Sequence, residues 1–141
     1  MFDIKKAYGF DKEAAEKGVK MICGPDPDKD YVVLCRMPND RYTAALTTKM
    51  QANHSRLEIL KKQDEEAYGK LNRQLMIEVM AETVVVAWGP GFGEDGTAIK
   101  YSTEVCIDFL AKYPDFRAAC AEFASNPSNY PIVSDLKEAK K

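Results

Sequence analysis

One helical pattern constrains the folding of this chain more than any other feature. From residue 71 to residue 84, apolar side chains recur on two adjacent rows of a helix face. The rows consist of Leu71, Leu75 and Val79, and of Met76, Met80 and Val84. An apolar face of this width is buried only when other elements pack against it from more than one side. The helix is therefore predicted to lie at the centre of a small core.

The first third of the chain has the signals of a β-hairpin. One strand is predicted over residues 19–23 and a second over 31–37, where apolar residues dominate. Residues 24–30 between them are rich in Gly, Pro and Asp, which is typical of a turn. Residues 1–8 are a candidate third strand at the sheet edge. Residues 11–17 are predicted to hold one helical turn that Gly18 ends.

Helix signals dominate the remainder of the chain. Asn39 or Asp40 is predicted to cap a helix that continues to residue 60. Ser102 is the N-cap expected for a later helix, and Pro114 suits the first position of the last one. Residues 84–86 are three valines, which suit a strand equally well by propensity. Because the pattern before them is helical, we interpret them as the end of that helix.

These signals predict one domain of the α+β class, mainly helical, with an N-terminal β-hairpin or small antiparallel sheet. The chain has 141 residues, which is one domain's worth. We place a single globular domain at 1–133, with a β-containing part at 1–38 and a helical part at 39–133. Residues 134–141 have little to bury and are predicted to form a mobile tail.

Composition and charge exclude several functional classes. The net charge of −2 predicts no affinity for nucleic acid or membranes. Residues 1–6 lack the pattern of a signal peptide, so we expect a reducing cytoplasm and unpaired cysteines. The cysteines and the lone His54 lack the spacing of a metal site, and His54 has no catalytic partner in sequence. We therefore expect no metal, no cofactor and no catalytic residue.

A glycine pattern is the one segment that matches a cofactor motif. Gly91, Gly93 and Gly96 have the spacing of a dinucleotide-binding loop after an apolar run. In that motif a helix begins within the glycines, whereas residues 97–101 are predicted to be extended and the next helix begins at Ser102. The preferred interpretation is a surface loop with a turn at 95–96.

Aromatic residues flank this loop, and two interpretations of them remain open. Trp88, Phe92 and Tyr101 are either an anchor that holds the loop or an exposed hot spot for a protein partner. Phe92 is expected to be the most exposed of the three, because glycines flank it. Met76 and Met80 are either core residues or part of an adaptable binding surface. All five are our candidate partner-binding residues.

A longer pattern is distributed over a helix end, the loop and the helices that follow. It consists of Ala81, Glu82, Thr83, Val84, Trp88, Glu94, Asp95, Gly96, Ile99, Tyr101, Ser102 and Glu104. It closes with Phe123, Ala124, Asn129 and Tyr130, and residues 39–42 add an upstream match. This pattern resembles the tail assembly chaperones of long-tailed bacteriophages. Two departures are the glycine-rich loop and Thr103, where the family more often has Lys or Arg.

The resemblance implies a non-catalytic role in the cytoplasm of an infected bacterium. Such chaperones bind the tape-measure protein, recruit tail-tube subunits and are absent from the mature virion. Self-association remains open. In many phages of this type a ribosomal frameshift yields a longer product, so Lys140 and Lys141 are open to two interpretations: part of a slippery site, or a basic, solvated tail. The alternatives are a structural virion protein such as a head–tail joining component and, more remotely, a nucleotide-binding enzyme that uses the glycine loop.

Overall fold

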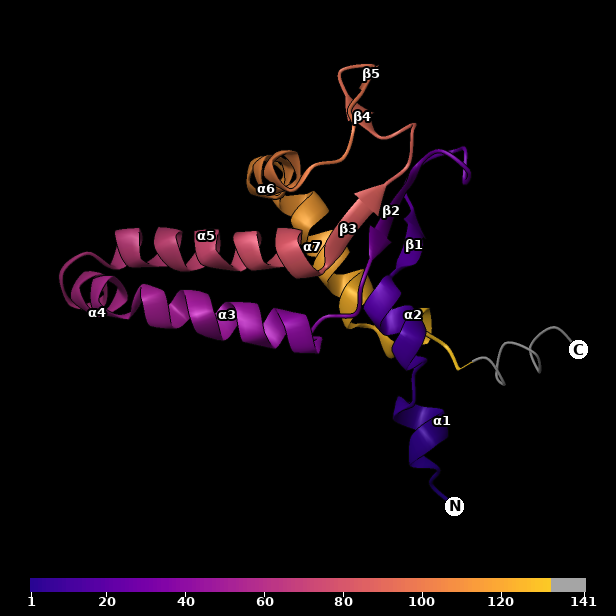
Figure 1. Ribbon diagram of the computed structural model, residues 1–141, viewed down its shortest axis with the longest axis horizontal. Helices are drawn as coiled ribbons and strands as arrows, with labels where there is room; N and C mark the ends of the chain where they lie inside the picture. The colour runs from indigo at the N-terminus through magenta and orange to yellow at the C-terminus, as the bar shows by residue number, and fades with distance from the viewer. Residues whose placement is uncertain (133–141) are drawn as a thin grey trace, which may run out of the picture.

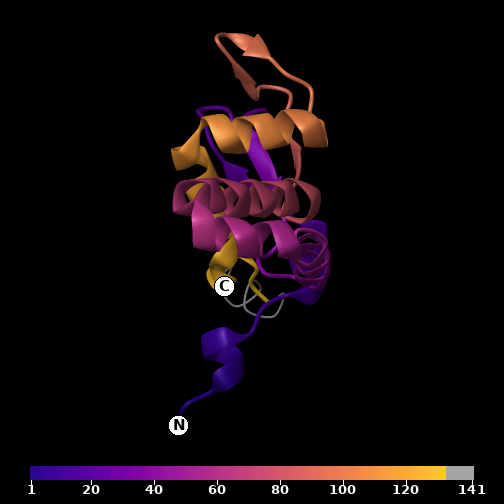
Figure 2. The same ribbon diagram turned by 90° about the vertical axis from the view of Figure 1, so that its left-hand side faces the viewer.

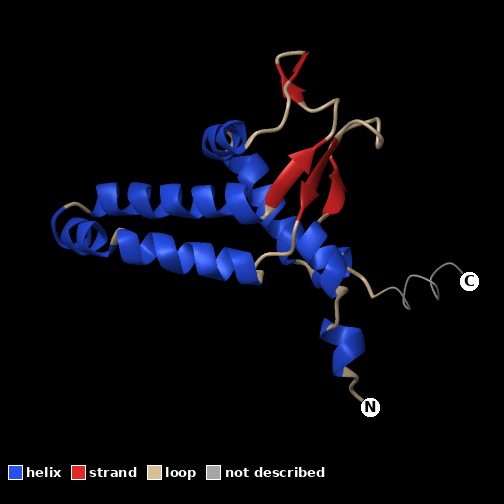
Figure 3. Cartoon of the chain, viewed as in Figure 1, coloured by secondary structure: helices blue, strands red, loops and turns tan. Residues whose placement is uncertain are grey.

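Helices and a small sheet share one core in the computed structural model, which describes residues 1–132 (Figure 1). The sheet has the order β1 (Val19–Ile22), β2 (Tyr31–Leu34) and β3 (Val85–Trp88), and both pairs are antiparallel. Helices make up most of the remaining structure (Figure 3). The predicted α+β class, mainly helical with a small antiparallel sheet, is thus confirmed. The tail predicted for 134–141 lies outside the described residues.

The predicted hairpin is present, but the third strand comes from a different part of the chain. Val19 pairs with Leu34 in the hairpin, and Val32 of β2 pairs with Trp88 of β3. The helical interpretation of residues 84–86 was therefore wrong for Val85 and Val86. Two β-branched residues gain a partner strand here, and the Cys35 amide donates to the Val84 carbonyl at 2.8 Å. Tertiary pairing has overridden the helical pattern that precedes them.

The N-terminal residues form helices rather than an edge strand. Helix α1 (Ile4–Tyr8) begins after Asp3, whose carboxylate accepts hydrogen bonds from the amides of Lys5 and Lys6. The strand predicted over 1–8 was wrong, because this cap stabilises a helical turn instead. Helix α2 (Lys12–Lys17) matches the predicted turn, and it ends at Gly18 with a φ of 98°. Figure 2 shows α1 extending away from the rest of the molecule.

Three helices form an elongated hairpin to one side of the sheet (Figure 1). Helices α3 (Asp40–Ala52) and α5 (Glu65–Thr83) pack along one another, and α4 (His54–Gln63) joins them at the far end. The single helix predicted from residue 39 to residue 60 is divided at Asn53. There the Lys49 carbonyl accepts hydrogen bonds from both the amide and the side chain of Asn53. The side chain thereby competes with the regular helical ladder.

The remaining helices close the core as their caps predict. Ser102 caps α6 (Thr103–Lys112), and Pro114 is the first residue of α7 (Pro114–Ser125). The core gathers side chains from β2, β3, α5, α6 and α7, among them Leu34, Val79, Val85, Leu110 and Ala124. A short 3-10 helix, Pro127–Asn129, leads to Tyr130, which is fully buried and donates to the Leu34 carbonyl at 3.0 Å.

Candidate functional site

The predicted aromatic residues form one packed cluster, in which Trp88 belongs to the core and Phe92 and Tyr101 pack against it. The Trp88 ring stacks on Phe92 with 4.4 Å between centroids and meets Tyr101 edge-on at 4.9 Å. Phe109 of α6 stacks on Trp88 with 5.8 Å between centroids and lies tilted against Phe92 at 6.0 Å. Trp88 is only 8% exposed, and Phe92 is half-buried rather than exposed as predicted. Helix α6 supplies the apolar wall that the local sequence around Phe92 does not reveal.

Hydrogen bonds hold the same cluster in place. The Trp88 indole N–H donates to the Ile99 carbonyl at 2.6 Å. The Tyr101 hydroxyl lies 2.8 Å from the Val85 carbonyl and 3.3 Å from the Ala81 carbonyl. These contacts join the loop to β3 and to the end of α5. The arrangement favours the anchor interpretation of the aromatic residues, because their polar atoms already have partners inside the molecule.

The glycine pattern forms a β-hairpin, not a phosphate-binding turn. Strands β4 (Gly93–Glu94) and β5 (Thr97–Ala98) pair across a turn at Asp95 and Gly96, both with positive φ. A side chain at Gly93 would collide with the Thr97 carbonyl. The strand before the loop is antiparallel to its neighbour, and α6 begins only after the hairpin has ended. Nothing in this geometry places a helix N-terminus against the glycines, as dinucleotide binding requires.

Polar contacts join the β4–β5 hairpin to the end of α6, and we call the three residues Glu94, Lys112 and Tyr113 the latch. The Glu94 carboxylate accepts a hydrogen bond from the Lys112 ammonium at 2.8 Å and another from the Tyr113 hydroxyl. The hydrogen bond from Lys112 has the larger effect and the one from Tyr113 the smaller, and together they lower the pKa of Glu94 below its ordinary value. The latch is exposed to water, so we assign it an orienting role and little stability.

The two candidate methionines lie on the central helix and are covered by its neighbours. Met80 is buried in the core, and Met76 is partly buried against it. The Tyr42 hydroxyl of α3 lies 3.9 Å from the Met76 sulfur. Both residues therefore contact other parts of this chain, which favours the core interpretation over a free binding surface.

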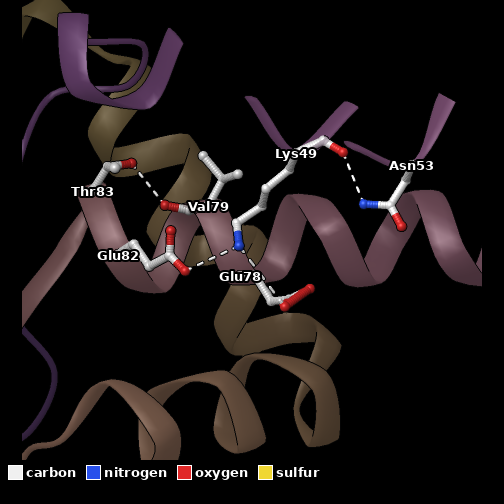
Figure 4. A network of polar contacts seen from close by, with 6 residues as sticks. All are labelled: Lys49, Asn53, Glu78, Val79, Glu82 and Thr83. Atoms are coloured by element: carbon white, nitrogen blue, oxygen red, sulfur yellow. Dashed lines mark hydrogen bonds and ion pairs between the residues drawn. The ribbon is translucent and has the colours of Figure 1, made fainter. Parts of the chain in front are cut away.

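A half-buried charge network lies between α3 and α5 (Figure 4). The Lys49 ammonium lies 3.2 Å from Glu82 and 3.9 Å from Glu78, which project from successive turns of α5. Nearby, the buried Thr83 hydroxyl donates to the Val79 carbonyl at 2.7 Å, in the last turn of the helix. The network joins two helices along their polar edge. It offers no nucleophile and resembles a structural clamp more than a reaction centre.

Sequence reasoning missed the most exposed group of apolar side chains among residues 1–132. Phe2 is 71% exposed, Ile4 69% and Tyr8 66%, and Met1 precedes them in the open. We call residues 1–8 the N-terminal arm. The Phe2 and Tyr8 rings lie 6.2 Å apart and are not part of the hydrophobic core. Asp3 was the available signal, since an Asp before an apolar residue is a common helix start.

Chemical groups that commonly serve metals or catalysis are sparse here. Among residues 1–132, no group of three His, Cys, Asp or Glu side chains is placed to hold a metal ion. Cys23 is exposed, whereas Cys35, Cys106 and Cys120 are buried, and all are unpaired. Burial raises the pKa of both Cys106 and Cys120 to about 12, so neither is a reactive thiolate at neutral pH. No helix within the described residues has the length and apolar character needed to cross a bilayer.

The fold and these surfaces define a small, mainly helical α+β protein with an exposed apolar arm. A family model for the YdaY prophage protein matches residues 37–141. The chain therefore belongs to the YdaY prophage protein family. No curated protein and no solved structure matches it significantly. The phage origin implied by the resemblance is supported, whereas the role in tail assembly is not addressed by this match.

Proposed function

We propose that this prophage protein is a non-catalytic assembly chaperone that binds the tape-measure protein and helps recruit tail-tube subunits. The observation that carries the proposal is the N-terminal arm, an apolar segment that the described chain leaves uncovered. A protein that masks apolar helices of another chain needs such a surface. The resemblance of residues 81–104 to tail assembly chaperones adds support, and so does membership of a prophage family.

The arm has the chemistry of a moderate-affinity binding element. Phe2, Ile4 and Tyr8 each expose most of their apolar surface, and Lys5 and Lys6 interrupt them. Covering one such side chain contributes about 1.5–3 kcal/mol before the cost of ordering the complex. The chaperone role places the protein in the host cytoplasm during assembly and outside the finished virion.

A structural virion protein, such as a head–tail joining component, is the alternative role. It shares the non-catalytic composition and needs an exposed apolar surface as well. Mass spectrometry of purified, induced prophage particles separates the two roles. The chaperone proposal predicts that the protein is absent from particles, and its presence in a fixed ratio to other virion proteins would establish the alternative.

Co-expression tests the chaperone role directly. The candidate tape-measure protein of the same prophage is expressed with and without this protein, and its soluble fraction is measured. We expect co-expression to raise that fraction and the two proteins to purify together. An unchanged soluble fraction and no co-purification would contradict the proposal.

Two arm variants connect the result to the proposed surface. Ile4→Ser removes apolar area from the arm, and Lys6→Ser changes the same helix turn without doing so. We expect Ile4→Ser to reduce capture of the tape-measure protein and Lys6→Ser to leave it close to wild type. Equal capture by both variants would show that the arm is not the surface that binds the tape-measure protein.

A further inference from the structure

A small pocket lies between α2 and the segment that leads from β2 into α3. Its volume is about 160 Å³, and its apolar walls come from Phe10, Ala15 and Pro38. Arg36 lines the same space. A space of this size holds one side chain and is too small for most whole metabolites.

Contacts on both sides of Arg36 hold it in position. Its amide donates to the Ala15 carbonyl at 2.9 Å, and its carbonyl accepts from the Asn39 side chain at 2.8 Å. Its guanidinium carbon lies 3.8 Å from the centroid of the Phe10 ring. The ring covers one face of the cation and orients its planar fork. The donor is thus arranged before any ligand arrives, which reduces the cost of binding.

One nitrogen of the same guanidinium has no hydrogen-bond partner among the described residues. The Arg36 Nε is buried and makes no hydrogen bond. Within residues 1–132, no carboxylate forms an ion pair with this side chain. A guanidinium group presents paired N–H donors in one plane, and a carboxylate accepts hydrogen bonds from two of them at once. The chemistry of the pocket therefore calls for an anion with two coplanar oxygens.

The other charges around the pocket offset that of Arg36. Lys12 adds a positive charge, while Glu16 and Asp40 contribute exposed carboxylates to the same lining. The formal charges of the lining sum to zero, so binding of an anion depends on direct hydrogen bonds to the Arg36 guanidinium. The apolar walls also suit the methylene groups that carry a carboxylate in an acidic side chain. We propose that this pocket binds one carboxylate, presented by an acidic side chain of a protein partner.

Side-chain NMR of Arg36 tests this proposal on the full chain. The Nε–Hε signal of Arg36 is followed while a blocked Gly-Glu-Gly peptide is added, with a Gly-Gln-Gly peptide as the neutral control. We expect a saturable shift with the Glu peptide and a dissociation constant at least about tenfold weaker for the Gln peptide. The exposed Arg56 on α4 serves as the internal reference and should not move. Equal shifts with both peptides, or no shift with either, would overturn the proposal.

Variants and a second anion complete the test. Arg36→Lys keeps the charge but loses the fork, so the Glu peptide should bind more weakly while the backbone spectrum stays folded. Inorganic phosphate should bind more weakly than the Glu peptide, and tighter binding of phosphate would refute the carboxylate assignment. If Asp135→Asn with Glu138→Gln shifts the Arg36 signal without peptide, a carboxylate of this chain occupies the pocket and the partner version fails. The tape-measure protein is not used, so the chaperone role is tested separately.

Discussion

The loop around Trp88 and the N-terminal arm are both rich in aromatic residues, yet their surroundings differ. They lie at opposite ends of the molecule (Figure 2). The loop aromatics pack on α6 and donate hydrogen bonds to backbone carbonyls, whereas the arm aromatics, Phe2 and Tyr8, are exposed. An aromatic residue becomes a binding site only where the rest of the chain leaves it uncovered. The comparison therefore moves the candidate surface from the loop to the arm.

The largest expected effect tests whether the loop aromatics stabilise the fold. Trp88→Ala removes the ring that contacts Phe92, Tyr101 and Phe109 and leaves a cavity beside the core. We expect a loss of about 3–5 kcal/mol in the free energy of unfolding. Chemical denaturation followed by circular dichroism measures it. An unchanged midpoint would return Trp88 to the class of exposed binding residues.

Phe92→Ala is expected to have an intermediate effect. The ring is half-buried and lies 5.7 Å from Phe116 as well as against Trp88. A loss of about 1–3 kcal/mol is expected, because only part of the side chain leaves an apolar environment. Denaturation measures this loss, and pull-down with the tape-measure protein should show unchanged capture. Lost capture with unchanged stability would restore Phe92 as a partner contact.

The contribution of the latch to the stability of the fold is expected to depend on pH. Because the folded pKa of Glu94 is lowered from its ordinary value of 4.5, the latch stabilises the fold above that pH. Its contribution is lost as the pH falls below 4.5 through the lower folded pKa. The unfolding midpoints of wild type and Glu94→Gln should therefore differ slightly near neutral pH and converge in acid. A difference that persists in acid would show that the carboxylate charge is not the cause.

The smallest effect on stability is expected in the arm. Phe2→Ala should change the free energy of unfolding by no more than about 0.5 kcal/mol, because the side chain is exposed. Thermal unfolding of wild type and variant measures this. Lys5→Ala is the matched control on the same helix. A clear loss of stability for Phe2→Ala alone would mean that the arm packs on the rest of the protein in solution. The contrast between buried loop aromatics and exposed arm aromatics would then be wrong.

Local signals accounted for much of the fold. Asn39, Ser102 and Pro114 begin helices where the sequence predicts, because caps act within a single turn. The hairpin over 19–34 was predictable for a similar reason, since its turn chemistry lies between its own strands. Asp3 carried the same kind of local information about α1 and was misinterpreted as part of a strand.

Long-range contacts decided what these signals left open. Val85 and Val86 follow a helical pattern and became a strand only because β2, more than fifty residues earlier, offers a free edge. Phe92 became half-buried because α6 provides Phe109. The candidate partner-binding residues were recognised as a set in the sequence, but their accessibility depends on neighbours that are distant along the chain. The pocket at Arg36 also depends on distant residues, since Phe10 and Ala15 form part of its walls.

The amino-acid sequence by itself determined the fold class, the hairpin and most helix boundaries, because propensity, capping and turn chemistry act over a few residues. It also carried the pattern that led to a phage protein, which the match to the YdaY family supports. Only the tertiary structure decided the origin of the third strand, the burial of Trp88 and the exposure of Phe2, Ile4 and Tyr8. These properties depend on which distant surfaces meet, since burial is a property of the packed chain and not of any segment alone.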